Sequence, residues 1–429
     1  FVCKYLDENK ISLSRAETNR ITLECVGVKR TTGQHPGGII VVPREYEVYD
    51  FTPVQHPADD PNSDIVTTHF AFSYLHDTIL KLDELGHDIP TKYKWLERFS
   101  DTSVMDVKMN DRSVYELFYS TEPLGVTPDD IDSQIGTYGL PEMGTRFIQQ
   151  VLIDAKPRNF ADLLQISGLT HGTNVWLGNA QDLIKEGICD ISQVIGTRDG
   201  IMLDLIRYGL DNGLAFKIME SVRKGRGLTP EWIEEMKAHD VPDWYISSCK
   251  KIKYMFPKAH AAAYVIDAIR LMWYKIYYPV AFYAAYFSAA PDGFDGEIVM
   301  GGKDHVKEVL TDLNRRKNEI SQKEADVADA LMLVNEYYQR GYEFLPVDVR
   351  KSHATKYLPE NGKIRLPFTS LPGLGQTAAE NIMAARDAHE IYSIEQLQND
   401  SKMSKTVLEI LDRNGALQGI SKTNQLSLF

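Results

Sequence analysis

The pattern of apolar and polar positions predicts mixed structure at the start of the chain. Residues 1 to about 30 interleave charged and apolar positions, which is typical of helices. Three short apolar runs follow at 39–42, 65–70 and 78–82, and each indicates a strand bounded by turn-forming residues. We therefore expect one small sheet that buries all three runs.

The remainder of the chain is predominantly helical. Residues 112–290 carry a helical pattern that is interrupted by turn-forming stretches. Within the aromatic-rich helix at 264–287, Pro279 predicts a kink or a break. Residues 291–302 have the composition of a linker, and a helical stretch then continues to about Gly341, followed by short strands that include 363–368. The fold class is therefore α+β, with several domains.

Length and charge narrow the class of protein. A chain of 429 residues is long enough for two to four domains, at roughly 100 to 200 residues each. Its apolar and charged contents, 43% and 25%, are those of a soluble globular protein. A net charge of -13 argues against nucleic-acid binding by bulk charge, so any DNA contact must be local.

Cysteine spacing and hydropathy exclude further classes. The four cysteines lie far apart without a Cys-x-x-Cys pair, so neither a zinc site nor a disulfide framework is indicated and a cytoplasmic location fits best. No membrane partner is expected, because the most apolar window, 261–290, is broken by Asp267, Arg270, Lys275 and Pro279. The first residue is Phe1, which suggests a piece of a longer protein.

Two stretches near the start of the chain could meet phosphate or metal. Lys29, Arg30 and His35 precede Gly37 and Gly38, a turn whose backbone N–H groups could approach an anion. The same residues also fit an ordinary tight turn before a strand.

Asp83 ends an apolar run, where a buried carboxylate needs a cation such as Mg²⁺. A helix cap or a surface acid would explain it equally well.

A cationic and aromatic stretch lies at 249–265. It holds Lys250, Lys251, Lys253, Lys258 and His260 without an acidic residue, and Tyr254, Phe256 and Tyr264 lie among them. Cations beside aromatic rings suit a phosphate-bearing ligand with a base that can stack, and we favour this interpretation over a solvated run of charge.

Two further features concern DNA and a protein partner. Gly373 and Gly375 permit a tight hairpin before a helix of small residues, and the N–H groups at that helix start could bind a DNA phosphate. This matches a helix-hairpin-helix element, although an ordinary Gly-rich turn is the alternative. The chain ends with apolar residues at Leu426, Leu428 and Phe429, which suggests a partner pocket in place of a frayed tail.

Taken in order, these stretches resemble the C-family bacterial replicative polymerases, in particular the PolC-type DNA polymerase III alpha subunit of Gram-positive bacteria. The resemblance covers essentially the whole chain, and its landmarks are VGVKRTTGQHPGGIIVVP, ILKLDELG, FPKAHAAAYV, WYKIYYPVAFYAAYFS, LPGLGQTAAENI and QLSLF. It implies template-directed transfer of a nucleotide from a dNTP to a primer 3′-OH through two Mg²⁺ ions. Three aspartates would hold these ions, with Asp83 as the third. The other two would lie upstream, so we expect the chain alone to be inactive.

The resemblance also implies domains and site residues. Residues 1–30 would end a thumb, 31–115 a nucleotidyltransferase-type palm, 116–290 would form helical fingers, and 291–429 a duplex-binding region with a helix-hairpin-helix at 363–415. The implied nucleotide contacts are Lys258, His260, Tyr254 and Arg198, with Ser167 and His171 as weaker candidates. The implied sliding-clamp (beta) peptide is 425–429, with contacts from Gln425, Leu426, Leu428 and Phe429. Primer-template DNA, a dNTP, the clamp and other replisome subunits would be the partners.

Two rival hypotheses stay open at this point. In the first, the chain is a non-catalytic module that binds DNA through the hairpin and a clamp through its tail, while Asp83 is structural. In the second, it is a smaller nucleotidyltransferase acting on tRNA or antibiotics, in which the hairpin and the terminal peptide would have no place.

Overall fold

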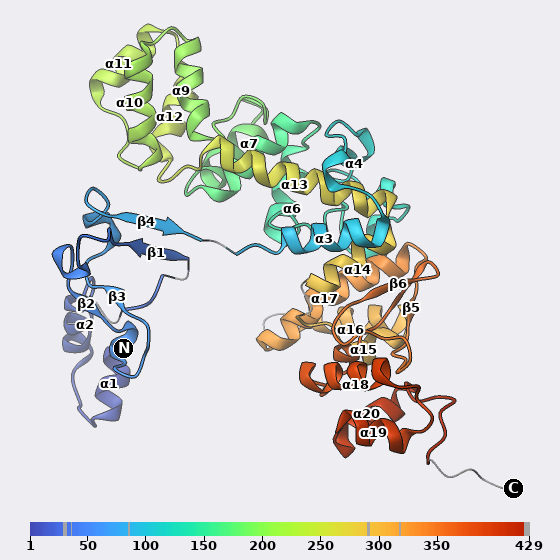
Figure 1. Cartoon of the computed structure of the whole chain (residues 1–429). Coiled ribbons are helices and arrows are strands. Elements are labelled where there is room, and N and C mark those ends of the chain that lie inside the picture. Colours follow the sequence, from blue (N-terminus) through green and yellow to red (C-terminus); the bar gives the residue numbers. More distant parts are fainter. Residues whose placement is uncertain (29–31, 36, 85, 290–291, 317–318, 424–429) are drawn as a thin grey trace, which may run out of the picture. The chain divides into compact units, whose positions relative to one another are not determined.

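The structure is a computed structural model that describes residues 1–28, 32–35, 37–84, 86–289, 292–316 and 319–423 (Figure 1). The chain divides into two compact units, residues 1–87 and 88–429. Helix α3 (Ile89–Ser100) packs on α14 (Pro279–Ala289) inside the second unit.

The first unit contains two helices and two small antiparallel ladders. Helix α1 spans Val2–Glu8 and α2 spans Arg15–Glu24, which confirms the helical start. The side chain of Ser14 caps α2 by accepting a hydrogen bond from the N–H of Glu17 at 3.2 Å. Strand β1 (Gly38–Val41) pairs with β4 (Leu80–Asp83), and β2 (Val54–Gln55) pairs with β3 (Thr67–Thr68). Short 3-10 turns lie at Val48–Asp50, Pro57–Asp59 and Phe72–Tyr74.

The prediction of one buried sheet is wrong. The three apolar runs contribute to two separate ladders, and the run at 65–70 supplies only the two residues of β3. Ile39 faces Leu82 across the β1–β4 ladder and Val41 faces Leu80, yet all four side chains are exposed, Leu80 to 65%. A two-stranded ladder buries a face only where another layer covers it, and the described part of this unit supplies none there.

The second unit is mostly helical (Figure 1). Its longest helices are α13 (Lys258–Tyr277) and α17 (Gln322–Gln339). A three-stranded sheet has β7 (Lys363–Arg365) between β5 (Phe344–Leu345), which is parallel to it, and β6 (Leu358–Glu360), which is antiparallel. The other helices are α4 (Arg112–Glu116), α5 (Pro128–Ile131), α6 (Arg146–Ala155), α7 (Phe160–His171), α8 (Gln181–Lys185), α9 (Arg198–Arg207), α10 (Asn212–Arg223), α11 (Pro230–Ala238), α12 (Asp243–Lys251), α15 (Gly296–Met300), α16 (Lys303–Arg315), α18 (Gln376–Ala388), α19 (Ile394–Ser401) and α20 (Lys405–Arg413).

Two expectations about chain breaks have different outcomes. The break at Pro279 is confirmed, because α13 ends at Tyr277 and α14 begins with the proline. The linker expected at 291–302 is wrong in part, because Gly296–Met300 within its described residues forms α15. Asp295 starts this helix by accepting hydrogen bonds from the N–H groups of Glu297 and Ile298 at 2.9 and 3.2 Å, a local cap that the linker-like composition concealed.

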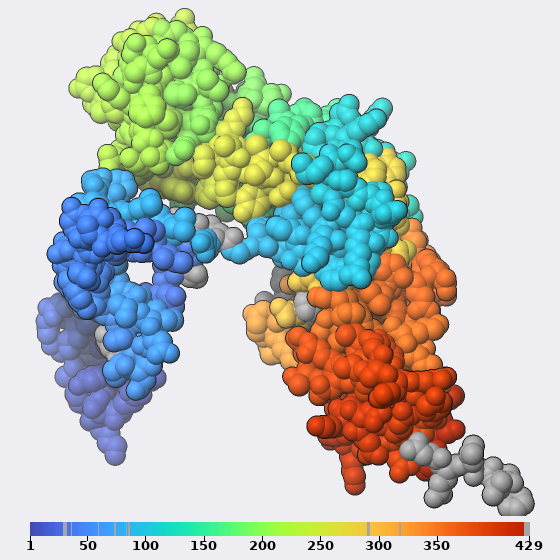
Figure 2. All heavy atoms as spheres, in the orientation of Figure 1, coloured from blue at the N-terminus to red at the C-terminus, as the bar shows by residue number. Residues whose placement is uncertain are grey.

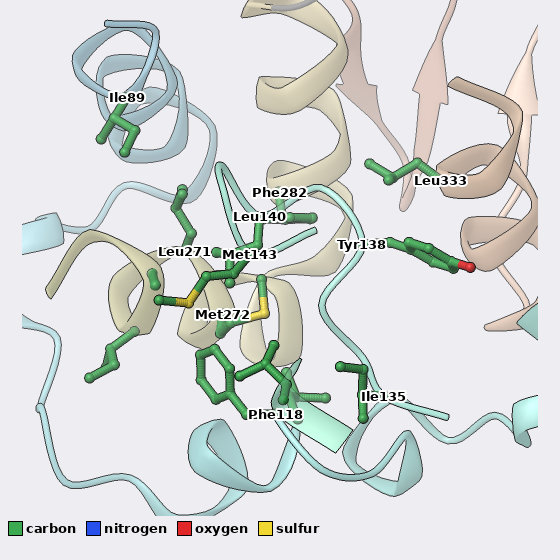
Figure 3. Packing of buried hydrophobic residues seen from close by; sticks show 14 of the residues in the cluster. Ile89, Phe118, Ile135, Tyr138, Leu140, Met143, Leu271, Met272, Phe282 and Leu333 are labelled. Atoms are coloured by element: carbon green, nitrogen blue, oxygen red, sulfur yellow. The ribbon is translucent and has the colours of Figure 1, made fainter. Parts of the chain in front are cut away.

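The core of the second unit joins helices to the segments that connect them. Leu271 and Met272 of α13 and Phe282 of α14 meet Leu140 and Met143 from the segment after α5, as Figure 3 shows. Further cluster members come from α3 and α17, so elements far apart in the sequence close over one another. Among the described residues, no helix has the combination of length and hydropathy that a membrane span requires.

A buried charged network crosses this core. Lys275 and Glu336 are both fully buried and lie 2.7 Å apart, Nζ to Oε1. Lys275 also donates to the carbonyl oxygens of Gly136 and Tyr138, each at 2.8 Å. Tyr283 donates to Glu336, and Arg340 donates to the carbonyl oxygen of Lys275. Burial lowers the pKa of Lys275 to about 8 in spite of Glu336. The network therefore joins α13, α14 and α17 to the segment at 136–138.

Candidate functional site

An aromatic and cationic group of side chains lies where α7, α9 and α13 meet. We define the histidine cluster as His171, Phe256, His260 and Tyr264. The ring of His260 lies 4.6 Å from that of Phe256 and 4.5 Å from that of Tyr264, centroid to centroid. The ring of His171 lies 5.2 Å from Phe256 and 5.9 Å from His260. Four rings from two segments of the chain, the end of α7 and the stretch at 256–264, thus form one contiguous group.

Backbone pairing brings these segments together. The N–H of Thr173, just after α7, donates to the carbonyl oxygen of Tyr254 at 3.0 Å, and the N–H of Arg198 donates to that of Phe256 at 3.2 Å. Gly168 lets α7 approach the start of α9, because an added Cβ would lie 2.1 Å from the carbonyl oxygen of Gly196. The first residues of α9 and α13 are therefore held beside the end of α7.

The contacts of the His171 ring favour its positively charged form. Its Nδ1 lies 2.6 Å from the carbonyl oxygen of Ser167, and its Nε2 lies 2.8 Å from a carboxylate oxygen of Glu142. Because both oxygens can only accept, the ring satisfies both contacts when both nitrogens carry protons. The hydrogen bond with Glu142 accordingly raises the pKa of His171 above its ordinary value. Burial, together with the nearby His171, lowers the pKa of His260.

Lys258 and Arg198 occupy the first positions of α13 and α9. The Lys258 side chain is exposed, and its backbone N–H donates to the carboxylate of Asp199 at 2.6 Å. Asp199 therefore caps α13 from the first turn of α9. Tyr254 is 46% exposed, and its ring meets Phe256 edge-on at 5.7 Å. Cations and an accessible ring thus border the histidine cluster.

The structure brings together most of the predicted nucleotide contacts. Lys258, His260, Tyr254, Arg198 and His171 lie on adjoining segments, as the bonds above establish. Ser167 does not line this surface with its side chain, since it is only 1% exposed and contributes its carbonyl oxygen to His171. Sequence reasoning missed Glu142 and Asp199. Asp199 could have been identified from the sequence because it directly follows Arg198. No residue near Glu142 in the sequence indicates that it belongs to the site.

The Gly-rich turn and Asp83 meet in the first unit. Gly38 pairs with Asp83 in the β1–β4 ladder, and the N–H of Glu84 donates to the carbonyl oxygen of Gly37 at 2.7 Å. The imidazole Nδ1 of His35 accepts a hydrogen bond from the N–H of Gly37 at 3.2 Å. Two stretches that the sequence marked separately therefore lie at one end of one ladder. Lys29 and Arg30 lie outside the described residues.

In the described part of the first unit, the structure gives no complete metal site. Only one candidate ligand, Asp83, was expected in this chain, and a single carboxylate cannot hold two ions. Among the residues that the structure describes, no group of three or more His, Cys, Asp or Glu side chains is placed to hold a metal ion.

The hairpin at 371–375 presents unpaired backbone donors. Leu371 and Leu374 are buried and fix the hairpin to the core, while Gly373 has a φ of 87° that favours glycine. Helix α18 begins at Gln376, and no described residue accepts a hydrogen bond from the N–H groups of Gln376, Thr377 or Ala378. These exposed donors lie on the lobe formed by α18, α19 and α20, which Figure 2 shows in red. They can bind an anion. The predicted tail contacts Gln425, Leu426, Leu428 and Phe429 lie outside the described residues.

The hairpin gives a testable prediction. We expect Gly373→Val to weaken duplex DNA binding roughly tenfold, because valine resists a positive φ and its side chain would crowd Ile410, whose Cδ1 lies 3.2 Å from an added Cβ. Gly375→Val should also weaken duplex binding, because the valine side chain would lie beside the N–H groups at the start of α18. The readout is fluorescence anisotropy of a labelled duplex, with Gly419→Val, at another positive φ, as the control for backbone strain. Equal affinity of both hairpin variants and the parent would make this region a spacer.

Comparisons with known families cover most of the chain. Residues 4–86 match the family described as the bacterial DNA polymerase III alpha NTPase domain, and residues 91–240 match the bacterial DNA polymerase III alpha subunit finger domain. Residues 341–426 match a helix-hairpin-helix motif, which confirms that prediction. The boundary between the first two matches coincides with the division between the two units.

Individual relatives are similar to this chain along its entire length. The chain is 51% identical over 429 residues to DNA polymerase III PolC-type of Bacillus subtilis (strain 168) and of Oceanobacillus iheyensis, and 48% identical to that of Caldanaerobacter subterraneus subsp. tengcongensis. All of this chain is covered in each case, but it spans only about 30% of the length of these relatives. The chain belongs to the family of bacterial DNA polymerase III of the PolC type.

Proposed function

We propose that this chain forms part of a replicative DNA-directed DNA polymerase and supplies its nucleotide-binding fingers and a duplex-binding region. The polymerase would add dNTPs to a primer 3′-OH. The relatives carry the name of such an enzyme along the whole of this chain. Under this proposal residues 1–30 end the thumb, 31–115 the palm and 116–290 form the fingers, while 291–429 contact duplex DNA.

The observation that carries the proposal is that cationic side chains and aromatic rings lie together at the histidine cluster. A dNTP combines a triphosphate with a flat base. Lys258, Arg198 and a protonated His171 would supply positive charge for the phosphates, and Tyr254 a face on which a base can stack. Glu142 would keep His171 charged, and Asp199 would hold Lys258 at the start of α13. The residues of this site therefore bind and orient the nucleotide.

The remaining contacts complete the proposed polymerase. The hairpin at 371–375 would hold the phosphates of primer-template DNA through backbone N–H groups. The peptide at 425–429 would bind the sliding clamp, and other replisome subunits would join the full-length enzyme.

Two Mg²⁺ ions would supply charge at the transferring phosphoryl group, with Asp83 as one of three ligands. Of these three ligands the resemblance assigns one, Asp83, to this chain, and its other residues would position the nucleotide and the DNA.

Lys258→Ala tests the proposed nucleotide site. In a full-length PolC-type enzyme carrying this sequence, we expect it to raise the apparent KM for dNTP roughly ten- to a hundredfold, since an ionic hydrogen bond to phosphate contributes about 1.5–3 kcal/mol. Affinity for primer-template should stay unchanged. Lys237→Ala, an exposed lysine on α11, is the matched control. A loss confined to primer-template binding would show that this stretch contacts DNA and not the nucleotide.

A further inference from the structure

A large groove in the second unit lies among residues that the proposed function does not use. It encloses about 1540 Å³ and is bordered by α4, the segment around α5, the end of α6 and the start of α7. Sites for small molecules usually hold roughly 300–1,000 Å³. The size of the groove therefore favours a polymeric ligand over a single nucleotide.

The groove is positively charged in an otherwise acidic chain. Arg112, Lys156 and Arg158 line it together with one acid, Glu122, whereas the chain as a whole carries 47 basic and 60 acidic residues. The three basic side chains are exposed, and in the described part of the chain no carboxylate lies within ion-pair distance of any of them. Their charge is available to a ligand.

Two acids beside the groove, Asp111 and Asp162, already have hydrogen-bond partners within the fold. Asp111 accepts hydrogen bonds from the N–H of Ser113 and from the hydroxyl of Tyr277, both at 2.9 Å. Asp162 is buried and accepts a hydrogen bond from the backbone N–H of Arg158 at 2.9 Å. These carboxylates are thus fixed to the fold and do not pair with the groove cations.

Lys156 and Tyr119 add two specific observations. Lys156 directly follows α6 as its C-cap, with φ 50° and ψ 60°, a left-handed position at which glycine would be relaxed. Tyr119 lines the same groove and is 40% exposed, so part of its side chain is open to a ligand in the groove. Grooves that bind single-stranded nucleic acid combine cations along a backbone path with aromatic rings on which bases stack. An acidic peptide would need the cations but not the ring.

We propose that this groove binds a single-stranded segment of DNA, with phosphates on Arg112, Lys156 and Arg158 and a base on Tyr119. The inference rests on the proposed function in one respect, namely that DNA is the nucleic acid this chain meets. It adds a contact for the unpaired strand that is made by residues other than those assigned to the dNTP and the duplex.

The test measures the affinity of the whole chain for a fluorescein-labelled oligo-dT by anisotropy, across a range of salt concentrations. We expect the triple variant R112Q/K156Q/R158Q to bind at least about tenfold more weakly. Each phosphate contact on a single strand contributes about 0.7 to the slope of log affinity against log salt, so that slope should fall by about 2. The matched variant K94Q/K217Q/K237Q removes the same charge from exposed sites elsewhere and should bind like the parent.

Two single variants separate binding from folding. Lys156→Gly should weaken binding without lowering the melting temperature, since glycine relaxes the left-handed position. Tyr119→Ala should weaken binding roughly tenfold with an unchanged salt slope, and Tyr119→Phe should restore it. Equal affinities of the two triple variants would overturn the inference. Displacement of oligo-dT by an oligoglutamate of equal charge, with no effect of Tyr119→Ala, would also overturn it in favour of an acidic peptide.

The outcomes distinguish this inference from the proposed function. If the groove variants bind oligo-dT normally while Lys258→Ala still raises the KM for dNTP, the groove inference fails and the polymerase proposal stands. If the groove variants lose single-strand binding while Lys258→Ala leaves that KM unchanged, the groove is a DNA site and the proposed nucleotide site is wrong.

Discussion

Replacing Lys275 with Met should lower the free energy of unfolding of the second unit by about 3–5 kcal/mol, because it leaves the carboxylate of Glu336 buried without its cation. Glu336 would keep a hydrogen bond from Tyr283, but its Oε2 already has no hydrogen-bond partner among the described residues. The carbonyl oxygens of Gly136 and Tyr138 would lose their donor as well.

Tryptophan fluorescence during urea unfolding measures this effect selectively. All five tryptophans lie in the second unit, at positions 95, 176, 232, 244 and 273. Lys94→Met, an exposed lysine on α3, is the matched control and should change stability by no more than about 0.5 kcal/mol.

The double variant K275M/E336L should recover part of the loss, since apolar residues can replace a buried ion pair. A loss below about 1 kcal/mol in K275M would show that the core relaxes around Glu336.

Local chemistry made part of the fold predictable. Pro279 lacks a backbone N–H, so the end of α13 could be placed from the sequence, and the hairpin could be placed from Gly373 and Gly375. The apolar run at 39–42 predicted a strand correctly but burial incorrectly. A run of apolar residues shows that a strand has side chains to bury. It does not show whether another layer of the fold covers them. For the same reason Lys275, which interrupts an apolar window in the sequence, gave no sign of lying fully buried beside Glu336.

The candidate site was predictable to a similar degree. Lys258, His260 and Tyr254 lie in one short stretch, so their combination of charge and rings was visible in the sequence. The pairing of His171 with Glu142 was not, because a turn far back in the chain supplies the carboxylate. The groove at Tyr119 was missed for the same reason. Its cations come from both sides of α5 and α6, and no short stretch contains them together.

Asp83→Asn in a full-length PolC-type enzyme carrying this sequence is expected to have the largest effect on activity. Asparagine has nearly the same shape, so the pairing of position 83 with Gly38 in the β1–β4 ladder should survive. The substitution removes a negative charge where the proposed function needs a metal ligand. Phosphoryl transfer relies on positioning and on electrostatic stabilisation of the transferring group, so we expect primer extension to fall roughly a thousandfold or more.

Four measurements decide this prediction. Extension of a labelled primer should be lost in the Asp83→Asn enzyme, while anisotropy with the same primer-template should show nearly unchanged affinity, because under the proposed function the carboxylate would hold a metal ion and would not contact DNA. Glu84→Gln, a change of the neighbouring exposed acid, should retain the parental rate. The isolated chain should not extend the primer either, since a single carboxylate such as that of Asp83 would hold Mg²⁺ only weakly. Extension at near the parental rate by the Asp83→Asn enzyme or by the isolated chain would place the metal ligands elsewhere.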